Sequence, residues 1–505
     1  MPGTAALPGA VAQRFKFPRN GSPPGDIDEI PMTSAPPSPP LLITTLAEYQ
    51  TAFWLPVGQF LRERGVDVHF LSFDDRSHER LTAAGLPSVN AFDAARAAGS
   101  AATAASFEEW THRLGVADPN LWMSHERVAF GLRDGGELRR KFCAAAAAAE
   151  AALGPLCAGG RFPVVVQELG GFLSVVGTFF AARARGLDHY FIEPSFFKGR
   201  FLFLKNTYAA KKLSANPTVD LHPEVRRVLE KTRASQSLVI PVKDKHHYAA
   251  PERKIFNARN VKRLLQKWWD QRSGKRQEFG YLGAHVAGHL RMVVNGWRLK
   301  GSYTSLESLG RFLYYPLHVP GDVALTLRAP EYFDQLALID YMARTAPASH
   351  RVAFKEHPAM IGALDAGRIR ALLRRHDNVA LLPPQTNNYE VLKAADAVIT
   401  VNSKSGAEAL LLGKPVFVLG DAFYRFAPSV RRVDHLSQLP GALRAFVQSP
   451  GTAPDARAVE RFFQEVWDAT WPGELYQPTP DAAQRFADSL RQALSTNDRT
   501  AVIPA

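Results

Sequence analysis

Short apolar runs alternate with amphipathic runs over residues 352–426. The apolar runs lie at Val352–Phe354, Val379–Leu382, Ala397–Val401 and Pro415–Leu419, and each has the length of a buried strand. The amphipathic runs between them lie at Asp365–His376, Asn388–Ala395 and Ser405–Leu412. Strands that alternate with helices of this length are typical of βαβ units with a parallel sheet. This stretch therefore predicts one Rossmann-like half, with its functional residues at the carboxyl ends of the strands.

A second alternating pattern, earlier in the chain, predicts another Rossmann-like half. Its predicted strands lie at Leu41–Thr45, Val66–Phe73, Phe162–Val166 and His189–Ile192. A helical stretch that ends at Gly65 joins the first two strands, and the helix Phe172–Arg185 joins the last two. Residues 91–160, between these pairs, are rich in alanine and are predicted to be helical because alanine has the highest helix propensity.

These patterns divide the chain into four regions. They are a tail at residues 1–40, a first domain at 41–300 with a helical basic segment at about 205–300, a second domain at 301–440, and a terminal region at 441–505. The tail is rich in Pro, Gly, Ser and Thr without periodicity, which predicts disorder. The second domain opens with a predicted strand at Phe312–Leu317, and the terminal region holds predicted helices at Val459–Thr470 and Ala482–Leu494.

Length and composition are consistent with two ordinary globular domains. The 505 residues suffice for two sizeable cores. Lys and Arg number 61 against 48 Asp and Glu, and the net charge of +13 indicates anionic partners. The two cysteines, Cys143 and Cys157, imply neither a disulfide framework nor a metal site. No stretch reaches the roughly 18 apolar residues of a membrane span, and no signal peptide is recognisable, so the sequence predicts a cytoplasmic protein.

Most of the excess charge lies in one predicted helix, Glu252–Arg276. It carries nine Lys or Arg residues against Glu252 and Asp270, with Trp268 and Trp269 near its middle. A basic amphipathic helix with tryptophan is typical of elements that bind an anionic membrane surface. A solvated helix that packs by its apolar stripe is an equal alternative. Binding of nucleic acid is a weaker alternative and is not expected, because no recognised nucleic-acid module accompanies the helix.

Polar residues gather after two predicted strands of the second half. One strand runs into Lys355 and His357. Another runs into Asn402-Ser403-Lys404-Ser405-Gly406, where a helix begins. Hydroxyl groups and a glycine at a helix N-terminus can hold an anion, although an ordinary N-cap has the same composition. The lysine and histidine nearby favour a pocket for a phosphorylated ligand.

At these residues the sequence resembles a known family. The motifs are K-x-H-P from Lys355, A-D-A-V-I-T-V-N-S-x-x-G-x-E-A-L-L-L-G-K-P-V from Ala395, and L-G-x-A-F-Y from Leu419. Their order is similar to that of the bacterial capsule polysaccharide synthesis family, which includes the transferases that build the Kdo linker of lipid-anchored capsules. The resemblance covers about Phe312 to Phe426 and is diffuse over residues 41–205.

The resemblance implies an α/β protein of the GT-B class. Such a protein has two Rossmann-like domains that face a cleft, here with a helical basic insertion and C-terminal helices. The second domain would hold the nucleotide-sugar donor, by resemblance CMP-Kdo, and the acceptor would be a lipid-linked or other glycan. The family usually has glutamine where this chain has His318, a difference that bears on which sugar is recognised. Other capsule assembly proteins and the inner face of the inner membrane are further implied partners.

Roles on the donor side follow from the charge of the leaving phosphate. His357 can donate to that phosphate as it leaves, because a histidine donates or carries charge near neutrality. Its H-P pair also resembles the donor-phosphate motif of bacterial transferases that use CMP-activated acid sugars. The other candidate donor-binding residues are Lys355, Asn402, Ser403, Ser405, Gly406, Glu408, Gln385 and Asn388. Glu408 either binds ribose hydroxyls or complements the helix dipole, and the amide side chains either contact the base or cap a helix.

On the acceptor side, Glu168 and Glu193 terminate predicted strands of the first half. Either carboxylate is a candidate general base toward an acceptor hydroxyl, and either can equally be a loop carboxylate. The family has a carboxylate at the place of Glu193. No Asp-x-Asp lies in strand context, so neither a metal nor a cofactor is expected. The sequence thus predicts a glycosyltransferase; the alternatives are a UDP-sugar-dependent transferase or epimerase and a non-catalytic assembly or export partner.

Overall fold

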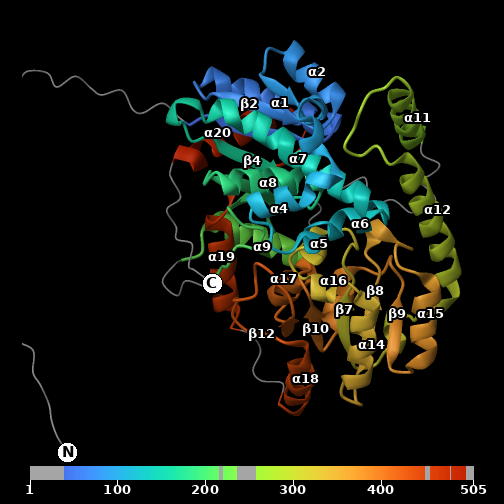
Figure 1. The fold of residues 1–505 in the computed structure, drawn as a ribbon. Helices are drawn as coiled ribbons and strands as arrows, with labels where there is room; N and C mark the ends of the chain where they lie inside the picture. The colour runs from blue at the N-terminus through green and yellow to red at the C-terminus, as the bar shows by residue number, and fades with distance from the viewer. Residues whose placement is uncertain (1–38, 215–219, 236–257, 450–454, 478, 496–505) are drawn as a thin grey trace, which may run out of the picture. The chain divides into compact units, whose positions relative to one another are not determined.

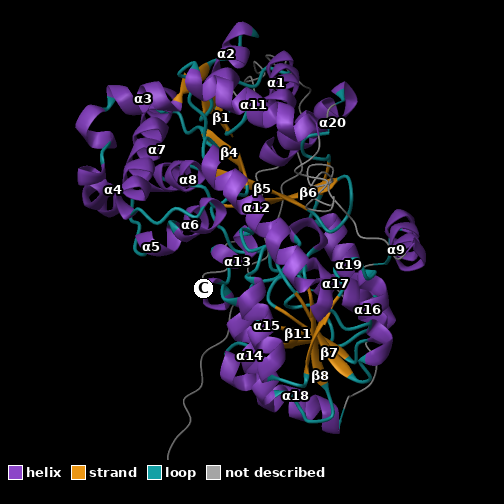
Figure 2. Ribbon diagram, turned by 90° about the vertical axis from the view of Figure 1, so that its right-hand side faces the viewer, coloured by secondary structure: helices purple, strands orange, loops and turns teal. Residues whose placement is uncertain are grey.

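The structure, a computed structural model, describes residues 39–214, 220–235, 258–449, 455–477 and 479–495. The predicted tail lies almost wholly outside these residues. So do residues 252–257, the start of the predicted basic helix. Within the described ranges the strands form two sheets, which Figure 2 shows as two separate groups of orange arrows.

The first sheet has seven strands in the order β13-β6-β5-β4-β1-β2-β3. The strands are β1 (Leu41–Thr45), β2 (Val68–Ser72), β3 (Ser88–Asn90), β4 (Val164–Glu168), β5 (His189–Pro194), β6 (Arg200–Lys205) and β13 (Trp471–Pro472). From β3 to β5 all neighbours are parallel, as predicted, whereas β6 is antiparallel to β5 and β13 is antiparallel to β6. Since β6 follows β5 directly in the chain, the chain turns back between these two strands.

Helices cover both faces of the first sheet (Figure 1). They are α1 (Glu48–Glu63), α2 (Asp75–Ala83), α3 (Ala91–Ala97), α4 (Phe107–Arg113), α5 (Pro119–Trp122), α6 (Ser124–Phe130), α7 (Gly135–Leu156) and α8 (Leu173–Ala184). The alanine run lies in α7, where Ala145 to Ala149 are all buried. Small side chains let α7 pack closely on α8, so the run serves the core as well as helix propensity.

The second sheet has six strands, all parallel, in the order β12-β11-β10-β7-β8-β9. The strands are β7 (Phe312–Pro316), β8 (Arg351–Lys355), β9 (Val379–Leu382), β10 (Ala397–Thr400), β11 (Val416–Val418) and β12 (Val430–Arg432). Its helices are α13 (Val323–Thr326), α14 (Gln335–Thr345), α15 (Ala366–Arg375), α16 (Asn388–Ala394), α17 (Lys404–Leu411) and α18 (Leu439–Gln448). Buried apolar strands and intervening helices match the predicted pattern to within one or two residues.

The two C-terminal helices return to different halves of the chain. Phe462 and Phe463 of α19 (Ala456–Asp468) join the core around β7 and β10, together with Val225 of α9 (Pro223–Ser235). Phe486 of α20 (Pro480–Ser495) packs on Trp54 of α1 at 5.5 Å between ring centroids. The terminal region therefore contributes to the cores of both halves. Two α/β halves, one with a mainly parallel sheet and one with an all-parallel sheet, and these returning helices confirm the predicted GT-B class.

Two helices from the predicted basic segment, α11 (Ala258–Arg272) and α12 (Leu282–Leu299), follow one another on one side of both sheets (Figures 1 and 2). Helix α11 is held to the first half by Asp270, whose carboxylate accepts two hydrogen bonds from the Arg76 side chain of α2. Asn295 of α12 donates to the carbonyl oxygens of Gly362 and Leu364 at 3.0 Å each. The segment thus contacts the first half through α11 and the second half through α12.

Candidate active site

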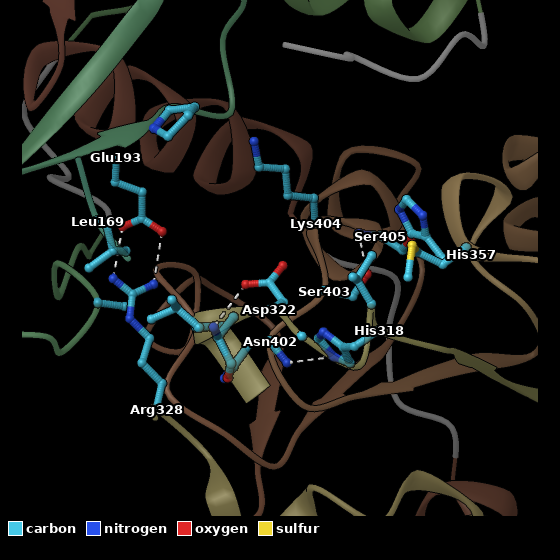
Figure 3. A pocket seen from close by; sticks show the side chains of 18 of the residues that line it. Leu169, Glu193, His318, Asp322, Arg328, His357, Asn402, Ser403, Lys404 and Ser405 are labelled. Atoms are coloured by element: carbon cyan, nitrogen blue, oxygen red, sulfur yellow. Dashed lines mark hydrogen bonds and ion pairs between the residues drawn. The ribbon is translucent and has the colours of Figure 1, made fainter. Parts of the chain in front are cut away.

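A cavity of about 600 Å³ is lined by residues from both halves, at the carboxyl ends of the strands. The first half contributes loops after β4 and β5, and the second contributes loops after β7, β8 and β10. Figure 3 shows the side chains that converge there. Carboxyl ends of parallel strands are the usual position of ligand sites in such sheets. The cavity therefore lies where the sequence predicted a site.

The predicted donor-binding residues form one wall of this cavity. His357 lies directly after β8, and Ser403, Lys404 and Ser405 lie at the start of α17 (Figure 3). Lys404 extends toward the first half, where its Nζ donates to the carbonyl oxygen of Ser195 at 3.1 Å. An imidazole, two hydroxyls and an ammonium group thus face one space. This set can donate to the oxygens of a phosphate.

Two backbone amides of this turn are hydrogen-bonded within the protein. Ser403 caps α17 through its own side chain, which accepts from the amide of Ser405 at 3.2 Å. The amide of Gly406 donates to the carbonyl oxygen of Ser403 at 3.0 Å. Gly406 itself packs on Tyr424, and a Cβ at this position would lie 2.3 Å from the Tyr424 hydroxyl. Anion binding at this turn would therefore rely on side chains and the helix dipole more than on these two amides.

Below the wall lies a buried polar network. Asn388 donates to the Glu408 carboxylate at 2.8 Å and to the Ser405 hydroxyl at 3.1 Å, and it accepts from the Tyr314 hydroxyl at 3.0 Å. Burial raises the pKa of Glu408 to about 7. Burial also lowers the pKa of Lys355 to about 8, and the Glu408 carboxylate opposes this lowering.

Three of the predicted donor-binding residues, Asn388, Glu408 and Lys355, make hydrogen bonds within the protein. Asn388 and Glu408 line the cavity but are 5% and 4% exposed, and their side chains hold Ser405 in place. Lys355 donates to the carbonyl oxygen of Thr386 at 2.9 Å, which fixes the loop before α16. Gln385 lies in that loop, is exposed, and is not among the described residues that line the cavity.

His318 stands where the family usually has glutamine, and it is buried against Asn402. Its Nε2 accepts from the backbone amide of Asn402 at 3.2 Å. Burial lowers the pKa of His318 to about 4, and His357 nearby lowers it further. A neutral ring that accepts at Nε2 carries its proton on Nδ1. His318, which lines the cavity, is therefore a neutral ring with its proton on Nδ1.

Glu193, one of the two candidate bases, forms an ion pair across the two halves. Both terminal nitrogens of Arg328 donate to its carboxylate, at 2.8 and 2.9 Å (Figure 3). The Arg328 side chain is only 5% exposed, and its Nε donates to the carbonyl oxygen of Tyr208 at 2.6 Å. A carboxylate bound by a guanidinium on both oxygens is a poor general base, because taking a proton weakens the pair. This geometry favours a tethering role for Glu193.

Glu168, the other candidate base, faces the cavity at the end of β4. Its Oε2 accepts from Gln50 Nε2 at 3.1 Å and from the Tyr476 hydroxyl at 2.5 Å. Tyr476 has a φ of +61°, a left-handed conformation that is costly for an aromatic residue. The Tyr476 ring packs edge-on against Phe53 at 5.5 Å. The strained backbone and the packed ring fix the hydroxyl against Glu168, which holds the carboxylate toward the cavity.

Several residues that line the cavity were not singled out from the sequence. One is His125, whose Nδ1 lies 2.9 Å from the Thr326 hydroxyl of the second half. Burial lowers the pKa of His125 to about 4. The ring lies under Gly171, where a Cβ would come within 2.4 Å of it. The Gly170-Gly171 pair after β4 was the available signal, because paired glycines at a strand end mark a close approach.

No group of three or more His, Cys, Asp or Glu side chains suited to a metal ion occurs among the residues that the structure describes. Cys143 is buried, Cys157 is partly buried, and both are free thiols. That the reaction needs neither metal nor cofactor remains a prediction from the sequence.

A comparison with family models matches residues 246–429 to the family described as capsule polysaccharide biosynthesis protein. The segment spans β7 to β11 and both polar strand ends. The resemblance to the capsule polysaccharide synthesis family is therefore confirmed over this segment. Among curated proteins, Protein FixF of Sinorhizobium fredii is 28% identical over 204 residues. The match covers 40% of this chain and 48% of FixF, so the chain spans about half the length of that relative.

Solved structures with a similar arrangement are more distant. A β-Kdo 2,7-transferase, KpsC of Thermosulfurimonas dismutans, is 14% identical with a TM-score of 0.33, over 68% of this chain and 89% of that chain. A UDP-GlcNAc 2-epimerase of Neisseria meningitidis, bound to UDP-GlcNAc, is 12% identical with a TM-score of 0.25, over 90% and 99% of the two chains.

Proposed function

We propose that this protein is a glycosyltransferase of capsule or surface polysaccharide synthesis, which takes its sugar from a nucleotide-linked donor. The observation that carries the proposal is the wall formed by His357, Ser403, Lys404 and Ser405 beside the family motifs. We further propose CMP-Kdo as the donor and a lipid-linked glycan as the acceptor, met at the inner face of the membrane. These finer assignments rest on the motifs that resemble the Kdo-linker transferases.

On the donor side, the sugar's anomeric carbon loses its bond to the nucleotide phosphate, and the bonding electrons stay on that phosphate. His357 and the hydroxyls of Ser403 and Ser405 would donate to its oxygens as the charge grows. Lys404 adds positive charge at the same wall. Donors that are already oriented stabilise this charge at little reorganisation cost, which is the main source of catalysis in such sites. The Asn388–Glu408 network keeps Ser405 in the required position.

On the acceptor side, a hydroxyl of the acceptor attacks the anomeric carbon and must lose its proton. Glu168 is the candidate base that the geometry favours, because Glu193 is bound on both oxygens by Arg328. The proton would pass to the Glu168 carboxylate. Tyr476 and Gln50 would hold that carboxylate at the proper angle.

The donor class can be tested with a thermal-shift panel of CMP, CDP, UDP and GDP. A nucleotide that binds the folded protein and not the unfolded chain raises the apparent melting temperature. CMP should give the largest shift, and the double variant Ser403→Ala/Ser405→Ala should abolish it. A shift confined to UDP would instead support a UDP-sugar enzyme. No shift with any nucleotide would support a non-catalytic assembly role and contradict the proposal.

A further inference from the structure

Helix α12 carries an exposed apolar stripe along its length. The stripe consists of Val286, Leu290, Val294 and Trp297, which are 44%, 54%, 51% and 69% exposed. Their spacing of four, four and three residues places them on one face of the helix, over about 16 Å at 1.5 Å rise per residue. A row of large apolar side chains in water marks an interaction surface.

The body of the protein is bound by the other face of α12. Met292, Asn295 and Leu299 are buried there, and Asn295 holds the loop of Gly362 and Leu364. Core packing therefore accounts for one apolar face of α12 and leaves the stripe unexplained. Helix α11 likewise has one face on the body and one exposed face. Asp270 faces the body, while Leu265, Trp268 and Trp269 are 61%, 53% and 63% exposed.

The charge around the stripe has one sign. Helix α12 contains no acidic residue, and Arg291 and Arg298 are exposed beside the stripe. On α11 the only acidic residue is Asp270, which is buried and paired with Arg76. Lys262 and Arg272 of α11 are exposed. Exposed apolar and aromatic side chains with basic neighbours are complementary to an anionic lipid surface.

A second copy of this chain fits the stripe less well. A two-fold contact would bring the same surface of both copies together, and since α12 has no acidic residue, neither copy would offer the other a carboxylate from α12 for Arg291 or Arg298. Like charges at a desolvated contact oppose association. None of the helices among the described residues is both long and apolar enough to cross a membrane.

We propose that the outward faces of α11 and α12 bind an anionic membrane surface, with the α12 stripe inserted at the headgroup level. This inference deepens the proposed function, whose lipid-linked acceptor would be met at that surface. The segment between the two helices contributes Phe279 to the cavity wall. The Asn295-bound loop continues from His357 and Met360, which also line the cavity. The stripe is thus joined by short segments to the predicted catalytic site.

The test is flotation of the full-length protein with vesicles of phosphatidylethanolamine that contain about one third phosphatidylglycerol. We expect binding at low salt, at least tenfold weaker binding to phosphatidylcholine vesicles, and weakening by about 0.5 M salt. Leu290→Ser/Trp297→Ser should weaken partition to the anionic vesicles about tenfold or more, because the inserted apolar area is lost. The control Phe162→Ser removes a side chain that is 71% exposed in the first half and should change nothing.

Charge is tested separately with Lys262→Gln/Arg291→Gln, against Lys231→Gln of α9 as control. The first variant should weaken binding to anionic vesicles several-fold, since each basic residue near such a surface adds to the attraction. Equal flotation of the stripe variant and the wild type would overturn the proposal. A concentration-dependent dimer in sedimentation, lost in the stripe variant without vesicle binding in the wild type, would also overturn it and assign the stripe to a second copy.

The nucleotide thermal shift separates this proposal from the proposed function. Both stripe and charge variants should keep the wild-type shift and melting temperature, because the substituted side chains are exposed. Vesicle binding without any nucleotide shift would contradict the proposed function and leave the lipid surface standing. A nucleotide shift without vesicle binding would contradict the proposed lipid surface and leave the proposed function standing.

Discussion

Arg328 of the second half donates both terminal nitrogens to the carboxylate of Glu193 in the first half, at 2.8 and 2.9 Å. The two residues are 135 positions apart in the chain. The pair lies at the cavity, where it joins the halves that carry the donor-side and acceptor-side residues. We therefore interpret Glu193 as a tether that sets the geometry of the site.

This interpretation predicts energetic coupling between the two side chains. In a double-mutant cycle with Glu193→Gln and Arg328→Met, the coupling should be about 2 kcal/mol, because the buried Arg328 guanidinium is poorly solvated once the partly exposed Glu193 carboxylate is neutralised. Urea unfolding of the four proteins measures it. A coupling below about 0.5 kcal/mol would show that the pair is no stronger than an exposed one.

The two candidate bases should behave differently on substitution. Glu168→Gln should abolish sugar transfer and spare the nucleotide thermal shift, because a base acts on the acceptor and not on donor binding. Glu193→Gln should lower the melting temperature more than Glu168→Gln does and retain part of the transfer activity. The assignment is reversed if Glu193→Gln alone eliminates transfer while its melting temperature stays at the wild-type value.

Tyr476 should support Glu168 through its hydroxyl. Tyr476→Phe removes the hydrogen bond to Glu168 and should reduce turnover about tenfold, the effect of about 1.4 kcal/mol. A positioning role predicts that turnover falls while the nucleotide thermal shift stays at the wild-type value, because Glu168 lies on the acceptor side. Tyr332→Phe, outside the cavity, is the control, and unchanged turnover in Tyr476→Phe would refute the positioning role.

Gly362 should be required for the loop that follows His357. Its φ is +77°, and a Cβ would lie 2.0 Å from the carbonyl oxygen of Met292 in α12. Gly362→Ala should therefore cost about 2–4 kcal/mol of unfolding free energy and reduce turnover by displacing this loop. Gly310→Ala is the matched control, because its φ is +65° with nothing within 4 Å of the added Cβ. Equal losses in both variants would mean that the contact with α12 carries no cost.

Glu408 should make stability depend on pH between about 4.5 and 7. Burial raises its pKa to about 7 in the folded protein from 4.5, so the folded state holds its proton after the unfolded state has lost it. The free energy of unfolding that protonated Glu408 contributes is therefore fully present below pH 4.5 and is lost as the pH rises to 7. Relative to wild type, Glu408→Gln should gain on the order of 1–3 kcal/mol across this window. Parallel pH curves for the two proteins would contradict the prediction.

How much of this site can be predicted from the sequence depends on whether a contact is local. The strands of the second half and the polar ends at Lys355–His357 and Ser403–Ser405 follow from apolar runs and strand ends, which are local signals. The Glu193–Arg328 pair and the contact of Tyr476 with Glu168, 308 positions away, depend on how distant segments pack. No local pattern marks either partner.

Two other differences between the prediction from sequence and the structure also have physical reasons. Strand β6, Arg200–Lys205, was not among the predicted strands, and its antiparallel pairing with β5 depends on the turn between the two strands. Helix α12 is apolar on two faces, so its pattern cannot tell the face that packs on the body from the stripe of Val286, Leu290, Val294 and Trp297. The exposed fractions make that distinction.

The measurement that tests the central claim most directly is transfer of labelled sugar from CMP-Kdo to lipid extracts of the source organism. Wild-type protein should incorporate label into the lipid fraction and release CMP in equal amount. His357→Ala should reduce this rate roughly a hundredfold or more, the scale of losing one transition-state donor, with its melting temperature unchanged. His112→Ala, an exposed histidine on α4, is the control. Wild-type transfer by a folded His357→Ala protein, or no incorporation by the wild type from any nucleotide sugar, would contradict the account.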